Sequence, residues 1–160
     1  MIFKKVGITF VSLGVALSIF ASSASAQNLN FDGASPLSAG CSLDGVVKAS
    51  KRLSYGKGKI ELRYSPSCKT AWARIILDSV ATHSWEANAT LGRNQDGKMY
   101  SCQDKGGNVV VNKGQRSCFT PMVYDGNGYS AYAFGGHYNS TRTIWQSKDC
   151  IVLIKKGAVQ

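Results

Sequence analysis

Short apolar runs alternate with turn-forming residues along most of the chain. The runs are VVKAS, KIELRY, AWARIIL, WEANATL, KMYSC, NVVV, CFTPMVY, SAYAF and CIVLI, separated by breaks such as YGKGK, SPSCK, NQDGK, DKGGN, NKGQ and DGNG. Gly, Asn and Asp suit such breaks because they tolerate the positive φ angles of tight turns. No window sustains a helical period of apolar residues. The pattern predicts an all-β barrel or sandwich of roughly seven to nine short strands.

The stretch KIELRYSPSCKTAWARI, residues 59–75, predicts a hairpin and its register. Its first half alternates apolar and charged residues, which is typical of a half-buried strand. Pro66 suits the second position of a type I turn, with Ser65 before it. If Ser65 opposes Thr70, the core-face pairs are Tyr64 with Ala71, Leu62 with Ala73 and Ile60 with Ile75.

On the other face of this hairpin, Arg63 opposes Trp72 and Glu61 opposes Arg74. We expect a cation–π pair and an ion pair there, both exposed. A slip of one residue would turn Arg63 and Arg74 into the core, so the pattern favours a single register.

The N-terminal stretch has the composition of a secretory signal peptide. Lys4 and Lys5 precede an uncharged apolar run from 6 to 20, and Ala24-Ser25-Ala26 matches the small-x-small cleavage pattern. The run is shorter than the ~18 residues of a spanning helix, so we expect cleavage, no lasting membrane span and a secreted, extracellular protein.

The domain limits follow from these signals. We expect a signal peptide at 1–26, a leader segment at 27–40, one all-β domain at 41–157 and a short tail at 158–160. The length suits a single packed core, and we expect a monomer.

The chain is basic, with a formal net charge of +10 that becomes +8 once Lys4 and Lys5 are removed. Such a charge attracts anionic partners. The Lys and Arg residues are scattered, as in KASKRL, KGK and IKK, with no run long enough for a nucleic-acid-binding arm. We therefore expect no specific nucleic acid partner, and either an anionic cell-envelope polymer or another secreted protein.

Five cysteines (41, 68, 102, 118 and 150) predict a disulfide framework in an exported chain. The odd number leaves one thiol over. No Cys-x-x-Cys occurs and the chain has two histidines, which argues against a zinc centre; NQDG and DGNG lack the spaced ligands of a calcium loop. We expect no metal and no cofactor.

ELRYSPSCKTAWARI, with Cys41 upstream and TPMVYD at 120–125, resembles the YjfA-like family of secreted bacterial proteins, a domain of unknown function. The resemblance covers roughly 41–133. It implies export, a compact disulfide-bearing domain, no assigned activity and a bond between Cys41 and Cys68. It does not place the remaining cysteines. Their shorter separation favours Cys102 with Cys118, which leaves Cys150 unpaired.

No motif marks a catalytic site, and nothing resembles G-x-S-x-G. A small secreted hydrolase would have to use His83 or His137, in a pocket that also holds an acid and a hydroxyl. A second alternative is an inhibitor that docks a rigid hairpin into another protein. We favour a non-catalytic binding module. The candidate binding surface comprises Tyr124, Tyr129 and Tyr132, near a Gly-rich turn, together with Arg63 and Trp72.

Overall fold

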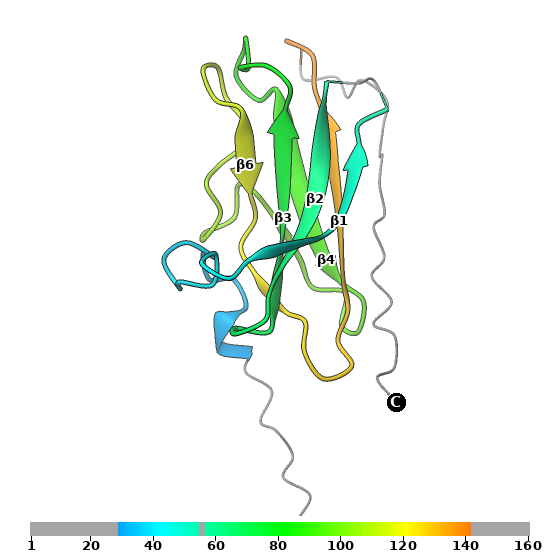
Figure 1. Cartoon of the computed structure of the whole chain (residues 1–160). Coiled ribbons are helices and arrows are strands. Elements are labelled where there is room, and N and C mark those ends of the chain that lie inside the picture. Colours follow the sequence, from blue (N-terminus) through cyan, green and yellow to red (C-terminus); the bar gives the residue numbers. More distant parts are fainter. Residues whose placement is uncertain (1–28, 55–56, 142–160) are drawn as a thin grey trace, which may run out of the picture.

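The computed structural model describes residues 29–54 and 57–141 and confirms the all-β prediction (Figure 1). Its described elements are η1 (Leu29–Phe31), β1 (Val46–Arg52), β2 (Gly58–Ser65), β3 (Thr70–Leu77), β4 (Ala87–Arg93), β5 (Met99–Ser101), β6 (Ser117–Phe119), β7 (Val123–Tyr124) and β8 (Ala131–His137).

The strands form two antiparallel sheets that face each other as a sandwich. Sheet A has the order β1-β2-β3-β6, with β7 also paired to β3, and sheet B has the order β5-β4-β8. Figure 1 shows the two layers, with β2 and β3 in front of β4 and the orange strand β8. The structure thus selects the sandwich from the two predicted architectures.

The main core lies between the sheets, because strand side chains alternate between faces. Sheet A contributes most of the bulky side chains, and sheet B contributes mainly alanines together with Leu91. Gly135 shows the fit: a Cβ placed there would lie 3.1 Å from Ile75 Cδ1 and 3.2 Å from Ile60 Cδ1. The buried residues of this core include Ile60, Leu62, Ala73, Ile75 and Leu77 from sheet A, and Ala87, Ala89, Leu91, Ala131 and Ala133 from sheet B.

The register predicted for the hairpin is confirmed. Ser65 opposes Thr70, and the pairing continues through Glu61 opposite Arg74 to Gly58 opposite Leu77. Ile60, Leu62, Ala71, Ala73 and Ile75 are all buried, and Tyr64, nearest the turn, is half-buried.

The expected character of the other hairpin face is wrong. Trp72 and Glu61 are only 3% and 4% exposed. The predicted cation–π pair exists, with Arg63 5.7 Å from the centre of the Trp72 ring. Glu61, however, pairs along its own strand with Lys59 at 2.7 Å and Arg63 at 3.4 Å, rather than across to Arg74.

The N-terminal segment (residues 29–45) explains the burial of Trp72, because it packs on the outer face of sheet A. The segment predicted as a leader is therefore part of the domain from residue 29 onward. Gly33 N donates to Met122 O and Met122 N donates to Ala34 O, both at 2.9 Å. A second small core lies under this segment and comprises Cys41, Trp72 and Met122, with Phe31, Ala34, Ala39, Cys68 and Phe119 packed around them.

Two of the expected strands differ from the structure. NVVV (108–111) contributes only an isolated bridge between Val111 and Ala87, because Val109 has a φ of 68° that a regular strand cannot accommodate. CFTPMVY is divided into β6 and β7, since Pro121 has no N–H to donate to a neighbouring strand.

Two disulfides close the fold. Cys41 is bonded to Cys68 and Cys102 to Cys118, as predicted. Cys118 lies in β6 and Cys102 directly follows β5, so the second bond joins the two sheets. No helix within 29–54 and 57–141 is long and apolar enough to cross a membrane. The predicted signal peptide, Cys150, the CIVLI strand and the tail all lie outside the described residues.

Candidate functional site

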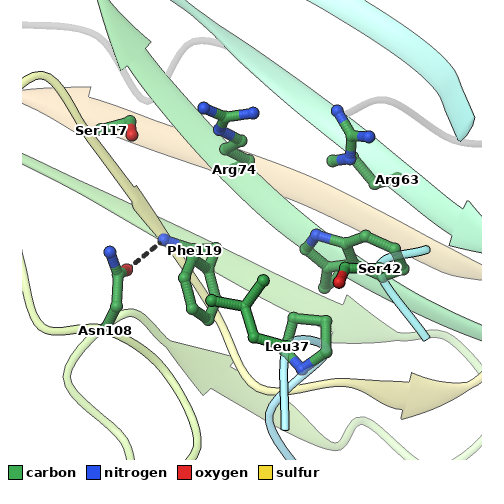
Figure 2. A pocket seen from close by; sticks show the side chains of 9 residues that line it. Leu37, Ser42, Arg63, Arg74, Asn108, Ser117 and Phe119 are labelled. Carbon is green, nitrogen blue, oxygen red and sulfur yellow. Dashed lines mark hydrogen bonds between the residues drawn. The ribbon is translucent and has the colours of Figure 1, made fainter. Parts of the chain in front are cut away.

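A cleft of about 350 Å³ opens on the outer face of sheet A, beside the N-terminal segment. We call it the arginine cleft. Figure 2 shows Arg63 and Arg74 rising from neighbouring strands on one side, and Phe119 and Leu37 on the other. Its lining residues are Pro36, Leu37, Ser42, Arg63, Trp72, Arg74, Asn108, Ser117 and Phe119.

Arg63 is held in a fixed position by its neighbours. Its Nη2 donates to Gly45 O at 2.8 Å, its Nη1 lies 3.4 Å from Glu61 Oε2, and its guanidinium lies over Trp72. Gly45 lies against the Trp72 ring, and only a residue without a side chain fits there, because a Cβ at position 45 would overlap the ring. The N-terminal segment thus sets both the depth of the cleft and the position of one of its charges.

Arg74 differs from Arg63. It is half-buried on β3, between Glu61 of β2 and Phe119 of β6 in the register. Among the described residues, its guanidinium makes no hydrogen bond and no ion pair. An arginine carries five N–H donors that require acceptors when they leave bulk water. Arg74 therefore offers a permanent positive charge to a ligand in the cleft.

The remaining polar groups of the cleft are donors or hydroxyls. Asn108 Oδ1 accepts from Phe119 N at 2.6 Å, a bond drawn in Figure 2. That bond uses the amide oxygen, so the NH₂ group, which can only donate, is left for the cleft. Ser42 and Ser117 add hydroxyls, and the lining residues that the structure describes include no Asp or Glu. This composition favours a ligand that carries an anionic group next to an apolar part.

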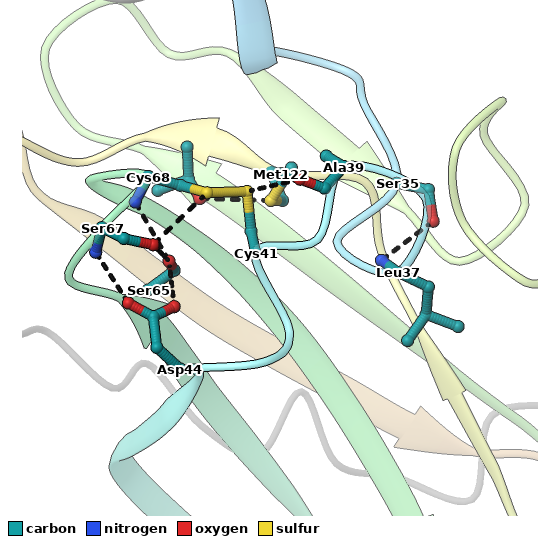
Figure 3. The surroundings of a disulfide bond; sticks show 10 residues. Ser35, Leu37, Ala39, Cys41, Asp44, Ser65, Ser67, Cys68 and Met122 are labelled. Atoms are coloured by element: carbon teal, nitrogen blue, oxygen red, sulfur yellow. Dashed lines mark hydrogen bonds between the residues drawn. A yellow bond between two sulfur atoms is a disulfide. The ribbon is translucent and has the colours of Figure 1, made fainter.

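The disulfide loop holds the adjoining hairpin tip (Figure 3). Asp44 accepts from Ser65 Oγ and from Ser67 N, and Ser65 Oγ accepts from Cys68 N at 3.1 Å. The hydrogen bonds from Ser65 and Ser67 lower the pKa of Asp44. The carboxylate and the Cys41–Cys68 bond thereby tie the N-terminal segment to the hairpin at two points.

The structure divides the predicted binding surface into two parts. Arg63 and Trp72 come together in the arginine cleft, although Trp72 is a wall with little exposed surface. Tyr124, in contrast, is 1% exposed, so the prediction that it forms an exposed platform is wrong.

The tyrosines do not form one platform. Tyr124 packs edge-on against Tyr129 with ring centres 5.5 Å apart, and Arg93 lies 5.0 Å from the Tyr129 ring centre. These two rings close one end of the sandwich. Tyr132 lies on the outer face of sheet B and stacks on Phe134 at 6.2 Å. The Tyr132 ring packs directly over Gly92, where a side chain would overlap it.

A second cavity, of about 330 Å³, lies at the opposite end of the sandwich. Glu86 and both histidines meet beside it: His137 Nε2 lies 3.3 Å from Glu86 Oε1, and His83 Nε2 lies 3.5 Å from Glu86 Oε2. Thr82 Oγ1 also donates to Glu86 Oε2, at 3.0 Å. The acid, hydroxyl and histidines that the hydrolase alternative required are therefore neighbours.

The geometry of this cluster is that of a loop anchor. Glu86 Oε2 accepts from Thr82 N at 2.6 Å and from His83 N at 3.2 Å. Burial opposes ionisation of Glu86, but these hydrogen bonds outweigh it and lower its pKa. Burial also lowers the pKa of His137, although Glu86 acts in the opposite direction. Thr82 Oγ1 donates to the same carboxylate oxygen, so its hydroxyl adds a third hydrogen bond to this anchor.

Several cleft residues could not be found from the sequence. The predicted register sets Arg74 opposite Glu61 and indicates an ion pair between them. Asn108 and Phe119 lie in runs that predict strands, and Leu37 lies in the predicted leader. The signal that could have found the site was the arrangement of two arginines on one face of the predicted hairpin, together with an N-terminal segment tied to its tip by Cys68.

Comparison with known proteins agrees with the sequence resemblance. The family model described as "Protein of unknown function (DUF2690)" matches residues 29–134. "Uncharacterized protein YjfA" of Bacillus subtilis (strain 168) is 36% identical over 148 residues, which are 90% of this chain and 94% of that protein. No solved structure matches significantly. The family match begins where the described N-terminal segment begins and includes every lining residue of the arginine cleft. The extent of both matches shows that the chain belongs to the DUF2690 family of YjfA-like proteins.

Proposed function

We propose that this protein is an extracellular, non-catalytic binding module that holds an oxyanion group of a cell-envelope polymer in the arginine cleft. The observation that carries the proposal is the Arg74 guanidinium, which is half-buried and has no partner among the described residues. A planar guanidinium suits carboxylate and phosphate groups because it can donate two parallel hydrogen bonds.

The surroundings of Arg74 support the same ligand chemistry. Phe119 and Leu37 supply an apolar wall, and Asn108 and the two serines supply hydrogen-bonding groups. A sugar or other carbon skeleton that carries an acid group would satisfy both sides. The formal charge of +8 expected for the mature chain would draw such a polymer toward the protein.

Export rests on two supports. Two disulfides are typical of proteins from oxidising compartments, and the N-terminal residues have the composition of a signal peptide. An exported protein reaches the anionic polymers of the cell envelope, so we take such a polymer as the ligand.

Binding to purified bacterial cell walls tests this proposal. We expect the folded protein to be retained at low salt and released as salt rises, because exposed charges are screened over ~8–10 Å at physiological ionic strength. Arg74→Gln should weaken retention at least ~10-fold, the loss expected when a charge-assisted bidentate contact is removed. Arg74→Lys should restore only part of it, because lysine keeps the charge and loses the fork.

The matched control is Lys113→Gln, which removes one exposed positive charge from a turn that does not line the cleft. Its retention should stay close to that of the unaltered protein. Retention that ignores salt, or that falls equally in both variants, would contradict a site at Arg74.

The hydrolase alternative has its own observation, which is the meeting of His83, His137 and Glu86 beside the second cavity. Its test is ester or amide hydrolysis by the purified protein. Activity that survives Arg74→Gln and disappears in His137→Gln, with the protein still folded, would favour the hydrolase over the binding module.

A further inference from the structure

We infer that the outer face of sheet A is a track for a linear polymer with an oxyanion on each repeating unit, on which Lys59, Arg74 and Arg63 contact successive groups and Glu61 lowers the affinity. This inference rests on the proposed function. It adds the extent and direction of the bound chain, a second contact residue outside the cleft, and an acidic residue that works against binding.

The register places the three cations on one face. Directly opposed residues of antiparallel strands project to the same side of a sheet. Glu61 opposes Arg74, and residues two positions along β2 from Glu61 are Lys59 on one side and Arg63 on the other. Arg74 on β3 therefore lies diagonally between them, about 7–8 Å from each at the Cα positions. The track crosses the strands at Arg74 and extends along β2 in both directions.

The three cations are not equally free. Arg63 is already hydrogen-bonded to Gly45, and its side chain is 20% exposed. The side chain of Lys59 is 42% exposed, and its Nζ lies 2.7 Å from Glu61 Oε1. Arg74 is the primary contact, because it alone of the three has no acidic partner within the part of the chain that the structure describes. Lys59 is the natural second contact, since a flexible exposed ammonium can turn from Glu61 to an incoming group.

Glu61 sits at the centre of the track with a side chain that is 5% exposed. It neutralises part of the charge of Lys59 and Arg63, and it faces any anion bound at Arg74 across one strand spacing. Two like charges in a partly buried site repel each other more strongly than they do in water. Glu61 therefore opposes the ligand, and its removal should strengthen binding, because it ends this repulsion and frees the charges of Lys59 and Arg63 for the polymer.

A polymer of acidic sugars or phosphates fits this face better than a nucleic acid does. Single-stranded nucleic acids bind through exposed aromatic rings on which the bases stack. Trp72 is 3% exposed and Phe119 is the one partly exposed ring among the cleft residues, whereas the stacking of successive bases needs several exposed rings.

Chain-length dependence tests the inference. We would titrate the protein with galacturonate as monomer, trimer and hexamer, and in parallel with orthophosphate, tripolyphosphate and long-chain polyphosphate. Affinity should rise with chain length in at least one series, beyond the increase expected from the number of binding groups alone. Lys59→Gln should weaken binding of the longest ligand about two- to fivefold, which is the size expected for one exposed ion pair, and should leave binding of the monomer unchanged. Glu61→Gln should strengthen binding of the longest ligand by a similar factor.

Lys51→Gln is the matched control for Lys59→Gln. Lys51 opposes Ile60 on the neighbouring strand, so it projects to the other side of the β1–β2 pair and carries the same charge. It should have no effect on chain-length dependence. Thermal unfolding of every variant would confirm that the fold is retained.

The outcomes separate the two proposals. Arg74-dependent binding of the short anions with no gain from chain length would overturn the track and leave the cleft intact. The track is also overturned if Lys51→Gln equals Lys59→Gln, if Glu61→Gln fails to strengthen binding, or if a single-stranded oligonucleotide of equal charge binds more tightly than both polymer series. Failure of every anion to bind in an Arg74-dependent way would remove the proposed function itself.

Discussion

Glu86 links the loop between β3 and β4 to the end of β8 through one carboxylate. Its Oε2 accepts from the backbone of Thr82 and His83 in the loop between β3 and β4, and its Oε1 lies against His137 at the end of β8. Lys57 and His83 are the other charged or titratable groups that act on His137. The charge state of this cluster therefore governs how firmly the loop is held to sheet B.

Stability should fall on acidification in two steps. The pKa of His137 is lowered in the folded protein, so the unfolded chain takes up the proton first and stability declines as pH falls through the ordinary value of 6.5. The pKa of Glu86 is also lowered, so its contribution is present above 4.5 and is lost below that value. Melting temperatures between pH 8 and pH 3 would show both steps.

Two variants distinguish these steps. His137→Gln should flatten the decline between about pH 7 and pH 5, while His83→Gln should retain it, because the buried imidazole is still present. A profile unchanged by His137→Gln would contradict this assignment.

At the scale of single elements, the β2–β3 hairpin is the piece around which the arginine cleft is built. Its inner face enters the sandwich core and its outer face carries Glu61, Arg63, Trp72 and Arg74. Its tip is tied to the N-terminal segment by the Cys41–Cys68 bond and by Asp44. The hairpin thus depends on a segment that precedes the first strand.

Loss of the Cys41–Cys68 bond should destabilise the protein by ~3–4 kcal/mol, since the bond closes a loop with a sequence separation of 27. Cys41→Ser, Cys68→Ser and the double variant should show similar losses in denaturant unfolding, because either single replacement already removes the bond. The same variants should weaken wall binding, since the segment that forms one side of the cleft is released. A double variant that is destabilised by the sum of the two single losses would contradict this account.

At the scale of the whole molecule, a buried ionic cluster closes the end of the sandwich opposite the histidines. Arg93 has a side chain that is 2% exposed, and it pairs with Asp32 at 2.9 Å and with Asp96 at 2.6 Å. Asp32 also accepts from Tyr124 N at 2.7 Å and from Lys98 Nζ at 2.9 Å. One aspartate of the N-terminal segment thereby contacts strands β4 and β7.

Asp32→Asn should therefore destabilise the protein by ~2–3 kcal/mol, because it removes one of two acidic partners from a buried guanidinium. Asp96→Asn is the control, and it should cost less because Asp96 is 43% exposed at its side chain. Denaturant unfolding measures the difference. Limited proteolysis should cleave the Asp32 variant earlier within residues 29–45; equal protection in both variants would show that Asp32 does not hold the segment.

The sequence by itself determined the local features of this protein. Alternating apolar residues and turn signals predicted short antiparallel strands, and the charges of residues 59–75 allowed one hairpin register. The family resemblance and the short spacing of Cys102 and Cys118 indicated both disulfides. These features depend on neighbours along the chain or directly across a turn, where side-chain pattern and strand geometry leave few alternatives.

The tertiary structure decided what the hairpin's second face does. The pattern marks that face as polar, yet residues 29–45 fold over part of it, bury Trp72 and leave Arg74 beside a cleft. In the same way, two histidines 54 positions apart meet at Glu86, and Tyr124 turns inward behind Tyr129. Such contacts depend on the docking of segments that are distant in sequence, and the periodicity of a single strand shows which side chains share a face without showing what covers it.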